Sequence, residues 1–202
     1  MSYIDKNNSL EKIKSQNEII ILELGCGNSK QFTNSISIDL VDINGVDIVC
    51  DLNKGFPFIP DNSIDEIHSV HFLEHIDNLG NIMKEIHRIL KPKGIKIITV
   101  PHFSNPYFYS DYTHRNHFGL YSLCYFSKSM YFKRQVPVFY NDINFKIKSV
   151  SISFKSQYRL QGLFLKYVGK IINKRKFSLE FYEANLCYLF PSNEIKFIIE
   201  KS

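Results

Sequence analysis

Short apolar and β-branched runs recur along the first half of the chain and predict the strands of one sheet. Residues 19–22 are continuously apolar and end in the turn Gly25-Cys26-Gly27, as a buried parallel strand would. Similar runs at residues 36–39, 47–50, 64–70 and 95–100 predict four more strands. A helical stretch precedes the last of them. Strands that alternate with helices at this spacing predict an α/β fold with a doubly wound, mostly parallel sheet.

The second half of the chain has a different pattern. Residues 103–145 hold 14 of the 29 Phe and Tyr residues but few periodic runs, which indicates a lid or a substrate-facing insertion. Residues 145–154 and 195–200 alternate and predict two final strands, the last of them antiparallel. A stripe with helical spacing lies between these strands and comprises Leu160, Leu163, Phe164, Tyr167, Val168, Ile171 and Ile172. Its apolar face could meet a membrane, a second subunit or the core of the domain.

Composition restricts the class of protein. The chain has 202 residues, of which 44% are hydrophobic and 22% charged, as in one globular domain. Its apolar runs fall short of the roughly 20 residues that a membrane-spanning helix needs, and a secretion signal is not evident. The cysteines at positions 26, 50, 124 and 187 form no CxxC pair, so we expect neither disulfides nor a structural zinc site. These features favour a cytoplasmic protein.

Charge is distributed unevenly along the chain. Residues 112–179 carry 13 Lys or Arg against the single acid Asp142, whereas the remainder has an excess of acids. A strongly basic half indicates contact with phosphate, nucleic acid or an anionic membrane, unless it is only a solvated lysine-rich surface. We expect a small-molecule, glycan or lipid-linked partner, with an anionic membrane surface or a homodimer as further options, and we do not expect nucleic acid.

Polar residues follow the ends of the first three predicted strands. Asp39 ends the second strand and Asp51 follows the third, so both carboxylates should lie beside the glycine turn at the carboxyl edge of the sheet. They could accept hydrogen bonds from ribose hydroxyls and an adenine amino group. A dinucleotide fingerprint would need glycine at position 30, where the chain has Lys30, so nicotinamide cofactors are disfavoured.

Five segments together resemble the class I S-adenosylmethionine-dependent methyltransferases, in particular the type 11 group. They are ELGCGN at 23–28, SIDL at 37–40, CDLNKGFPF at 50–58, NSIDEIHSVHFLEH at 62–75 and EIHRILKPKGIKIITVP at 85–101. The resemblance implies a Rossmann-like sheet, S-adenosylmethionine as cofactor, and methyl transfer to oxygen or nitrogen of a small molecule, sugar or lipid-linked intermediate. It implies one domain over 1–202, with a cofactor-binding half at 19–105 and the lid, insertion and final strands at 106–202.

The resemblance also implies which residues bind the cofactor. These are Glu23, Gly25, Cys26 and Gly27 at the methionine end, Asp39 and Leu40 at the ribose, Asp51 and Leu52 at the adenine, and His71 near the methyl group. The chain departs from the family at Ser29, which replaces the third glycine. Only residues 28–34 separate the turn from the second strand, so the first crossover helix should be shortened.

All seven histidines fall within residues 68–117. His71, Glu74 and His75 spell HxxEH, the pattern of one group of zinc proteases, but the same letters recur in the methyltransferases that this chain resembles. We therefore expect no metal. His114 oriented by Asp111 is the expected general base for a hydroxyl acceptor, since a histidine titrates near neutral pH. A loop held together by polar side chains is the alternative interpretation of these two residues.

Two other functions stay open at this stage. The basic half would suit an RNA methyltransferase, although the chain has no recognisable RNA-binding module. Ser29 and the short crossover would suit a non-catalytic protein that keeps the fold and binds a partner.

Overall fold

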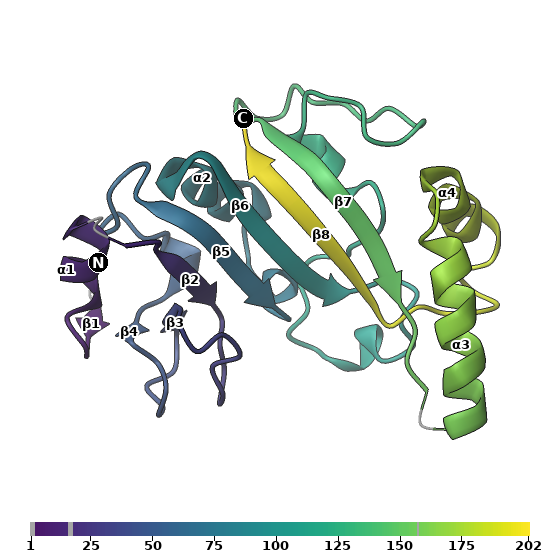
Figure 1. Ribbon diagram of the computed structural model, residues 1–202, viewed down its shortest axis with the longest axis horizontal. Helices are drawn as coiled ribbons and strands as arrows, with labels where there is room; N and C mark the ends of the chain where they lie inside the picture. Colours follow the sequence, from purple (N-terminus) through teal and green to yellow (C-terminus); the bar gives the residue numbers. More distant parts are fainter. Residues whose placement is uncertain (1–2, 16–17, 157) are drawn as a thin grey trace.

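The computed structural model describes residues 3–15, 18–156 and 158–202, whose strands form one eight-stranded sheet (Figure 1). The strand order is β1-β4-β3-β2-β5-β6-β8-β7. The strands are β1 Ile4–Asp5, β2 Ile21–Leu24, β3 Ile36–Asp39, β4 Ile48–Val49, β5 Ile64–Val70, β6 Leu90–Pro101, β7 Phe145–Ser153 and β8 Glu194–Lys201. Neighbours from β4 to β6 are parallel, whereas β1, β7 and β8 pair antiparallel. The Rossmann-like sheet with antiparallel last strands confirms the predicted fold class.

Four α-helices lie among the described residues, namely α1 Ser9–Ser15, α2 Leu79–Ile89, α3 Arg159–Ile172 and α4 Lys176–Asn185. Short 3-10 helices occur at η1 Leu52–Lys54, η2 Leu73–His75, η3 Phe108–Ser110 and η4 Ser122–Phe126. The sequence patterns predicted the helix before β6 and the helix of the 160–172 stripe. They did not predict α4 or the two-residue strand β1, because neither has a long periodic pattern.

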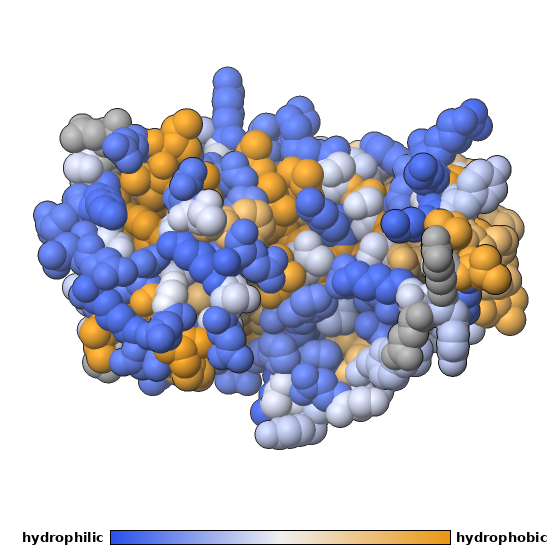
Figure 2. All heavy atoms as spheres, turned by 60° about the horizontal axis from the view of Figure 1, so that its bottom comes forward, coloured by the Kyte–Doolittle hydropathy of each residue, from blue (hydrophilic) through white to orange (hydrophobic). Residues whose placement is uncertain are grey.

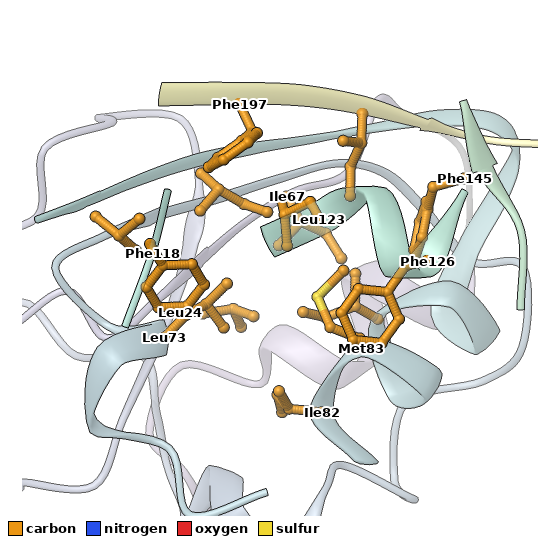
Figure 3. Close-up of a cluster of buried hydrophobic side chains, with 14 of the residues drawn as sticks. Leu24, Ile67, Leu73, Ile82, Met83, Phe118, Leu123, Phe126, Phe145 and Phe197 are labelled. Atoms are coloured by element: carbon orange, nitrogen blue, oxygen red, sulfur yellow. The ribbon is translucent and has the colours of Figure 1, made fainter. Parts of the chain in front are cut away.

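The hydrophobic core lies on one face of the sheet (Figure 3). Leu24 of β2, Ile67 of β5 and Phe197 of β8 are fully buried on that face. They pack against Met83 of α2 and Leu123 of η4 in a single cluster. Successive side chains of a strand point to opposite faces of the sheet, and the register of the strands places these three on the same side.

The opposite face of the sheet has less cover. Residues 25–35 and 40–47, which are fully described, join β2 to β3 and β3 to β4 without any helix. A parallel crossover that contains a helix needs a dozen or more residues, so these connections are too short for one, and the shortened first crossover helix expected from the sequence is replaced by a helix-free loop. Figure 1 accordingly shows β5, β6, β8 and β7 with no helix in front of them. Ile95, Ile97 and Ile198 stay only half-buried there.

Lys96 is an exception to the apolar character of the core face. It lies on β6 between Ile67 of β5 and Ile199 of β8, and its side chain is fully buried. Its Nζ has no hydrogen-bond partner within the described part of the chain. Burial disfavours the ammonium form and holds the pKa of Lys96 well below its ordinary value. This position therefore costs free energy of folding.

Replacing this lysine with an apolar side chain of similar length should stabilise the protein. We expect Lys96→Met to raise the free energy of unfolding by about 1–3 kcal/mol, the usual cost of an unsatisfied buried polar group. The stability of the wild type should increase as pH rises from the lowered folded pKa of Lys96 toward the unfolded value of about 10.4, because the unfolded state then binds more protons. Urea titrations at several pH values should show that the variant lacks this increase.

Lys201 provides the matched control. It is also buried, but its Nζ donates to the carbonyl of Leu90 at 2.7 Å and to Asn62 Oδ1 at 2.8 Å. Lys201→Met should therefore lower the stability, because it leaves these acceptors unpaired. Equal destabilisation by both substitutions would contradict the assignment of Lys96 as an unsatisfied buried polar group.

Candidate active site

A cleft of about 310 Å³ opens at the carboxyl ends of β2, β3, β4 and β5. Its lining consists of Gly25, Gly27, Asp39, Leu40, Asp51, Leu52, Asn53, His71, Phe72, His75 and Ile76. Seven of these were expected at a cofactor site from the sequence, namely Gly25, Gly27, Asp39, Leu40, Asp51, Leu52 and His71. The parallel arrangement brings them together because it places the carboxyl ends of these four strands at one edge.

The glycine turn forms the floor of this cleft. Gly25 has φ +69° and Gly27 has φ +57°, conformations that L-residues rarely adopt. A Cβ on Gly25 would come within 2.6 Å of the Phe72 ring, so this position needs glycine for packing as well. At Gly27 nothing lies within 4 Å of the position that a Cβ would take. Gly27 therefore leaves open space where a ligand can approach the backbone.

Two carboxylates border the cleft and are held by backbone amides. Asp39 accepts hydrogen bonds from the amide of Gly27 at 2.9 Å and from that of Val41 at 3.1 Å. Asp51 accepts from the amide of Asn53 at 3.1 Å and so caps η1. Each carboxylate keeps further acceptor positions, because an ionised carboxyl group has about four. The fixed carboxylates are suited to bind hydroxyl or amino groups of a ligand.

Glu23 and Cys26 are not part of the lining given by the described residues, although both were expected at the cofactor. The buried carboxylate of Glu23 accepts hydrogen bonds from the amides of Gln31 and Phe32 and from the hydroxyl of Ser35. It thus fixes the short connection between β2 and β3. Burial raises the pKa of the Cys26 thiol, which disfavours the thiolate.

His71 lies at the end of β5 with an unusual φ of +52°. Its Nε2 is 3.2 Å from Glu194 Oε1 and its Nδ1 is 3.3 Å from Glu74 Oε1. Hydrogen bonds to Glu194 and Glu74 raise the pKa of His71 to about 9. His71, followed by Lys155, in turn lowers the pKa of Glu194 to about 2. A charged imidazolium therefore links β5 to the start of β8 beside the cleft.

A second group of titratable side chains adjoins the cleft at His75. One ligand atom each of Glu74, His75 and His114 lie within 4.8 Å of one another, a grouping that could hold a metal ion. The rings of His75 and His114 are 4.9 Å apart. Thr113 Oγ1 lies 2.9 Å from His75 Nδ1 and donates to Asp111 Oδ1 at 2.6 Å. Asp111 is therefore connected to His75 through a threonine hydroxyl.

Asp111 and His114, the expected acid–base pair, lie near each other without a direct hydrogen bond. Asp111 Oδ2 is 3.6 Å from His114 Nε2, while His114 Nδ1 is 2.8 Å from the carbonyl of Phe108. Their catalytic roles stay a prediction. Hydrogen bonds of Thr113 and of its backbone amide lower the pKa of Asp111.

The sequence did not identify His75, Thr113 and Phe72 as site residues. His75 and Glu74 stand in the HxxEH letters, and His71 contacts Glu74, but the histidine whose ring lies beside that of His75 is His114, almost forty positions later. The sequence does not show that the loop after β6 packs against η2. The amides of Arg115 and Asn116 donate to the carbonyl of Glu74, a contact that spacing alone does not reveal.

Comparison with known proteins places the chain in a family. A family model described as a methyltransferase domain matches residues 4–134, more than half of the chain. A comparison with curated proteins returns no match.

Solved structures share the fold at low sequence identity. An S-adenosylmethionine-dependent methyltransferase from Archaeoglobus fulgidus is 17% identical with a TM-score of 0.56, over 97% of this chain and 94% of that one. The MccD protein is 15% identical with a TM-score of 0.52, over 97% of both chains. The [4+2]-cyclase SpnF is 14% identical with a TM-score of 0.51, over 96% of this chain and 80% of that one. By its family model, its sheet and its cleft, the chain belongs to the class I S-adenosylmethionine-dependent methyltransferases.

Proposed function

We propose that the protein methylates an oxygen or nitrogen atom of a small molecule, sugar or lipid-linked intermediate. The observation that carries this proposal is the cleft itself, in which a glycine turn and two fixed carboxylates adjoin a cluster of histidines. The open space at Gly27 admits a ligand to the backbone, and the acceptor positions of Asp39 and Asp51 suit ribose hydroxyls and an adenine amine. These residues fit S-adenosylmethionine.

The chemistry depends on positioning. The cofactor supplies a methyl group on a sulfonium, which moves to the acceptor by in-line displacement. The residues of this chain hold the acceptor in line and assist the loss of its proton. Glu74, His75 and His114 lie at the end of the cleft lined by His71 and His75, and we assign acceptor activation to this cluster. The fold alone leaves the acceptor open, since one sheet supports many reactions.

Substitution of Asp39 tests the cofactor site. Asp39→Ala should weaken binding of S-adenosylhomocysteine by about 1–3 kcal/mol, roughly a 5- to 150-fold rise in Kd, because it leaves ligand donors unpaired. Isothermal titration calorimetry measures this change. Asp42→Ala is the matched control, since Asp42 is exposed and lies outside the described lining. Absence of binding to the wild type at millimolar cofactor would favour a non-catalytic protein with this fold.

A surface far from the cofactor cleft supports the choice of a lipid-linked or membrane-proximal acceptor. Most of the apolar stripe of α3 is exposed, with exposed fractions of 84% for Leu160, 59% for Leu163 and 56% for Phe164. Phe177 and Phe181 of the adjacent α4 are also exposed and stack on each other. Figure 2 shows this hydrophobic surface at the end of the molecule that carries α3 and α4. We call it the α3–α4 surface. Because these residues of the stripe are exposed, the stripe as a whole does not pack into the core of the domain.

Charge favours an anionic membrane over a second copy of the chain as the occupant. Residues 155–179 contain seven Lys or Arg and no Asp or Glu. Two copies that met through this surface would bring like charges together, whereas anionic lipid headgroups complement them. No helix among the described residues is long and apolar enough to cross a membrane. The arrangement suits a helix that lies in the interface with apolar side chains inserted.

Three exposed lysines of this surface provide a test. Combined replacement of Lys166, Lys170 and Lys174 by Gln should weaken binding to phosphatidylglycerol-containing vesicles roughly 100-fold, at about 1 kcal/mol per lysine. The difference should shrink in high salt, where charges are screened. Replacing Lys146, Lys148 and Lys196 with Gln removes the same charge from exposed positions on β7 and β8 and should have a smaller effect. Vesicle co-sedimentation measures both.

Two outcomes would contradict the membrane assignment. Wild-type binding to vesicles by the α3 variant, together with loss of a dimer in sedimentation, would make the surface a subunit interface. Salt-dependent binding of RNA that the α3 substitutions abolish would favour the RNA methyltransferase. Neither result would affect cofactor binding.

A further inference from the structure

The cluster of Glu74, His75 and His114 contains a carboxylate oxygen that no hydrogen-bond donor of the described chain satisfies. Glu74 is fully buried, and its Oε2 has no hydrogen-bond partner among the residues that the structure describes. An unpaired buried carboxylate oxygen is costly, and such an atom in a native protein calls for an explanation such as an ion. Its other oxygen already faces His71.

The hydrogen bonds of the two histidines determine which ring nitrogen carries a lone pair. The single hydroxyl hydrogen of Thr113 goes to Asp111, which can only accept, so His75 Nδ1 must be the donor to Thr113 Oγ1. The carbonyl of Phe108 likewise accepts only, so His114 Nδ1 carries a hydrogen. In the neutral form, Nε2 of both rings therefore presents a lone pair.

The cluster is also held in place by the backbone. Amides of Arg115 and Asn116 donate to the carbonyl of Glu74, and the side chain of Asn116 donates to the carbonyls of Leu73 and Ile76. These contacts fix the loop of His114 against η2. Histidines that bind a metal commonly donate their second ring nitrogen to an outer partner that orients the ring, as His75 and His114 do here.

We propose that Glu74, His75 and His114 bind a divalent transition-metal ion, with Zn²⁺ as the first candidate. Two imidazoles and one carboxylate form a donor set that suits such ions, and three protein ligands leave a coordination position open. The cation would satisfy the unpaired oxygen of Glu74 and both lone pairs. This pairing differs from the HxxEH pattern of the sequence, which would use His71 in place of His114.

The role of this metal site rests on the proposed function, because His75 also lines the cofactor cleft and so connects the site to it. An acceptor hydroxyl in the open coordination position would become more acidic, since a bound cation lowers the pKa of coordinated hydroxyl groups. Its proton would pass to water, its oxygen lone pair would form the bond to the methyl carbon, and the carbon–sulfur bond would break with its electron pair going to the sulfonium sulfur, which becomes a neutral thioether. His114 thus acts as a ligand, in contrast to the free base expected from the sequence.

The experiment measures metal binding without any acceptor. Purified protein, stripped with a chelator, should bind one Zn²⁺ per chain in calorimetry, and Co²⁺ should give the visible absorption of a low-coordinate site. Saturation with Zn²⁺ at about 100 times its Kd should raise Tm by roughly 5–10 °C. We expect His75→Ala and His114→Ala each to abolish the one-to-one binding. Glu74→Gln, which preserves side-chain size, should do the same.

Variants around the site separate ligands from neighbours. Thr113→Val removes the acceptor of His75 Nδ1 but no ligand, so it should weaken Zn²⁺ binding roughly 10- to 100-fold. His117→Ala is the matched control, because His117 is exposed and lies three residues after His114 on the same loop. It should bind Zn²⁺ as the wild type does. His71→Gln should also retain binding. Circular dichroism of the metal-free variants shows whether each one folds.

Several results would overturn the proposal. The first is that the folded wild type binds no stoichiometric Zn²⁺. The second is that folded His114→Ala binds Zn²⁺ with the affinity of the wild type. The third is that His71→Gln loses Zn²⁺ binding while His114→Ala retains it. Calorimetry with S-adenosylhomocysteine distinguishes this failure from that of the proposed function. Cofactor binding without metal binding refutes only the metal site. Metal binding without cofactor binding refutes only the proposed function.

Discussion

The cleft depends on a buried carboxylate that replaces a helix. The connection between β2 and β3 is too short for the crossover helix that would normally cover this part of the sheet. Glu23 instead accepts hydrogen bonds from two amides and one hydroxyl of that connection, and Phe32 stacks on His68 with ring centroids 3.8 Å apart. These contacts hold the chain between the glycine turn and β3. Gly27, near the start of this connection, is joined to Asp39, at the end of β3, by a hydrogen bond from the Gly27 amide to the Asp39 carboxylate.

The sequence predicted the parts of the fold that depend on local pattern. The apolar run of β5 was placed with the bounds that the structure has, and so was β3, because both are bordered by polar residues or turns. β6 begins five residues before the predicted run at 95–100, at Leu90, so residues 91–94 belong to the strand as well. The two-residue strand β1 has little pattern of its own and depends on pairing with β4, whereas β4 itself lies within the run at 47–50 that was predicted as a strand.

The site was predicted less completely, because its chemistry depends on contacts between distant segments. Gly25, Gly27, Asp39 and Asp51 were found since each directly follows or ends a strand whose carboxyl end lies at the same edge. Glu23 stands in the same motif, yet its direction is set by strand alternation and by the loop it binds. The meeting of His75 with His114 depends on the loop after β6, whose path no local pattern specifies.

The distribution of chain length between the two halves bears on specificity. The cofactor half has connections of minimal length, whereas residues 102–144 and 154–193 form long segments around β7 and β8. Those segments supply His114, the exposed faces of α3 and α4, and Glu183, which lies 3.1 Å from buried His102 at the end of β6. Ordering such long segments costs conformational entropy, and packing of their aromatic residues offsets part of that cost. Among the described residues, the cleft is lined only by those from Gly25 to Ile76, so under the proposed function the long segments are the part of the chain left to distinguish one acceptor from another.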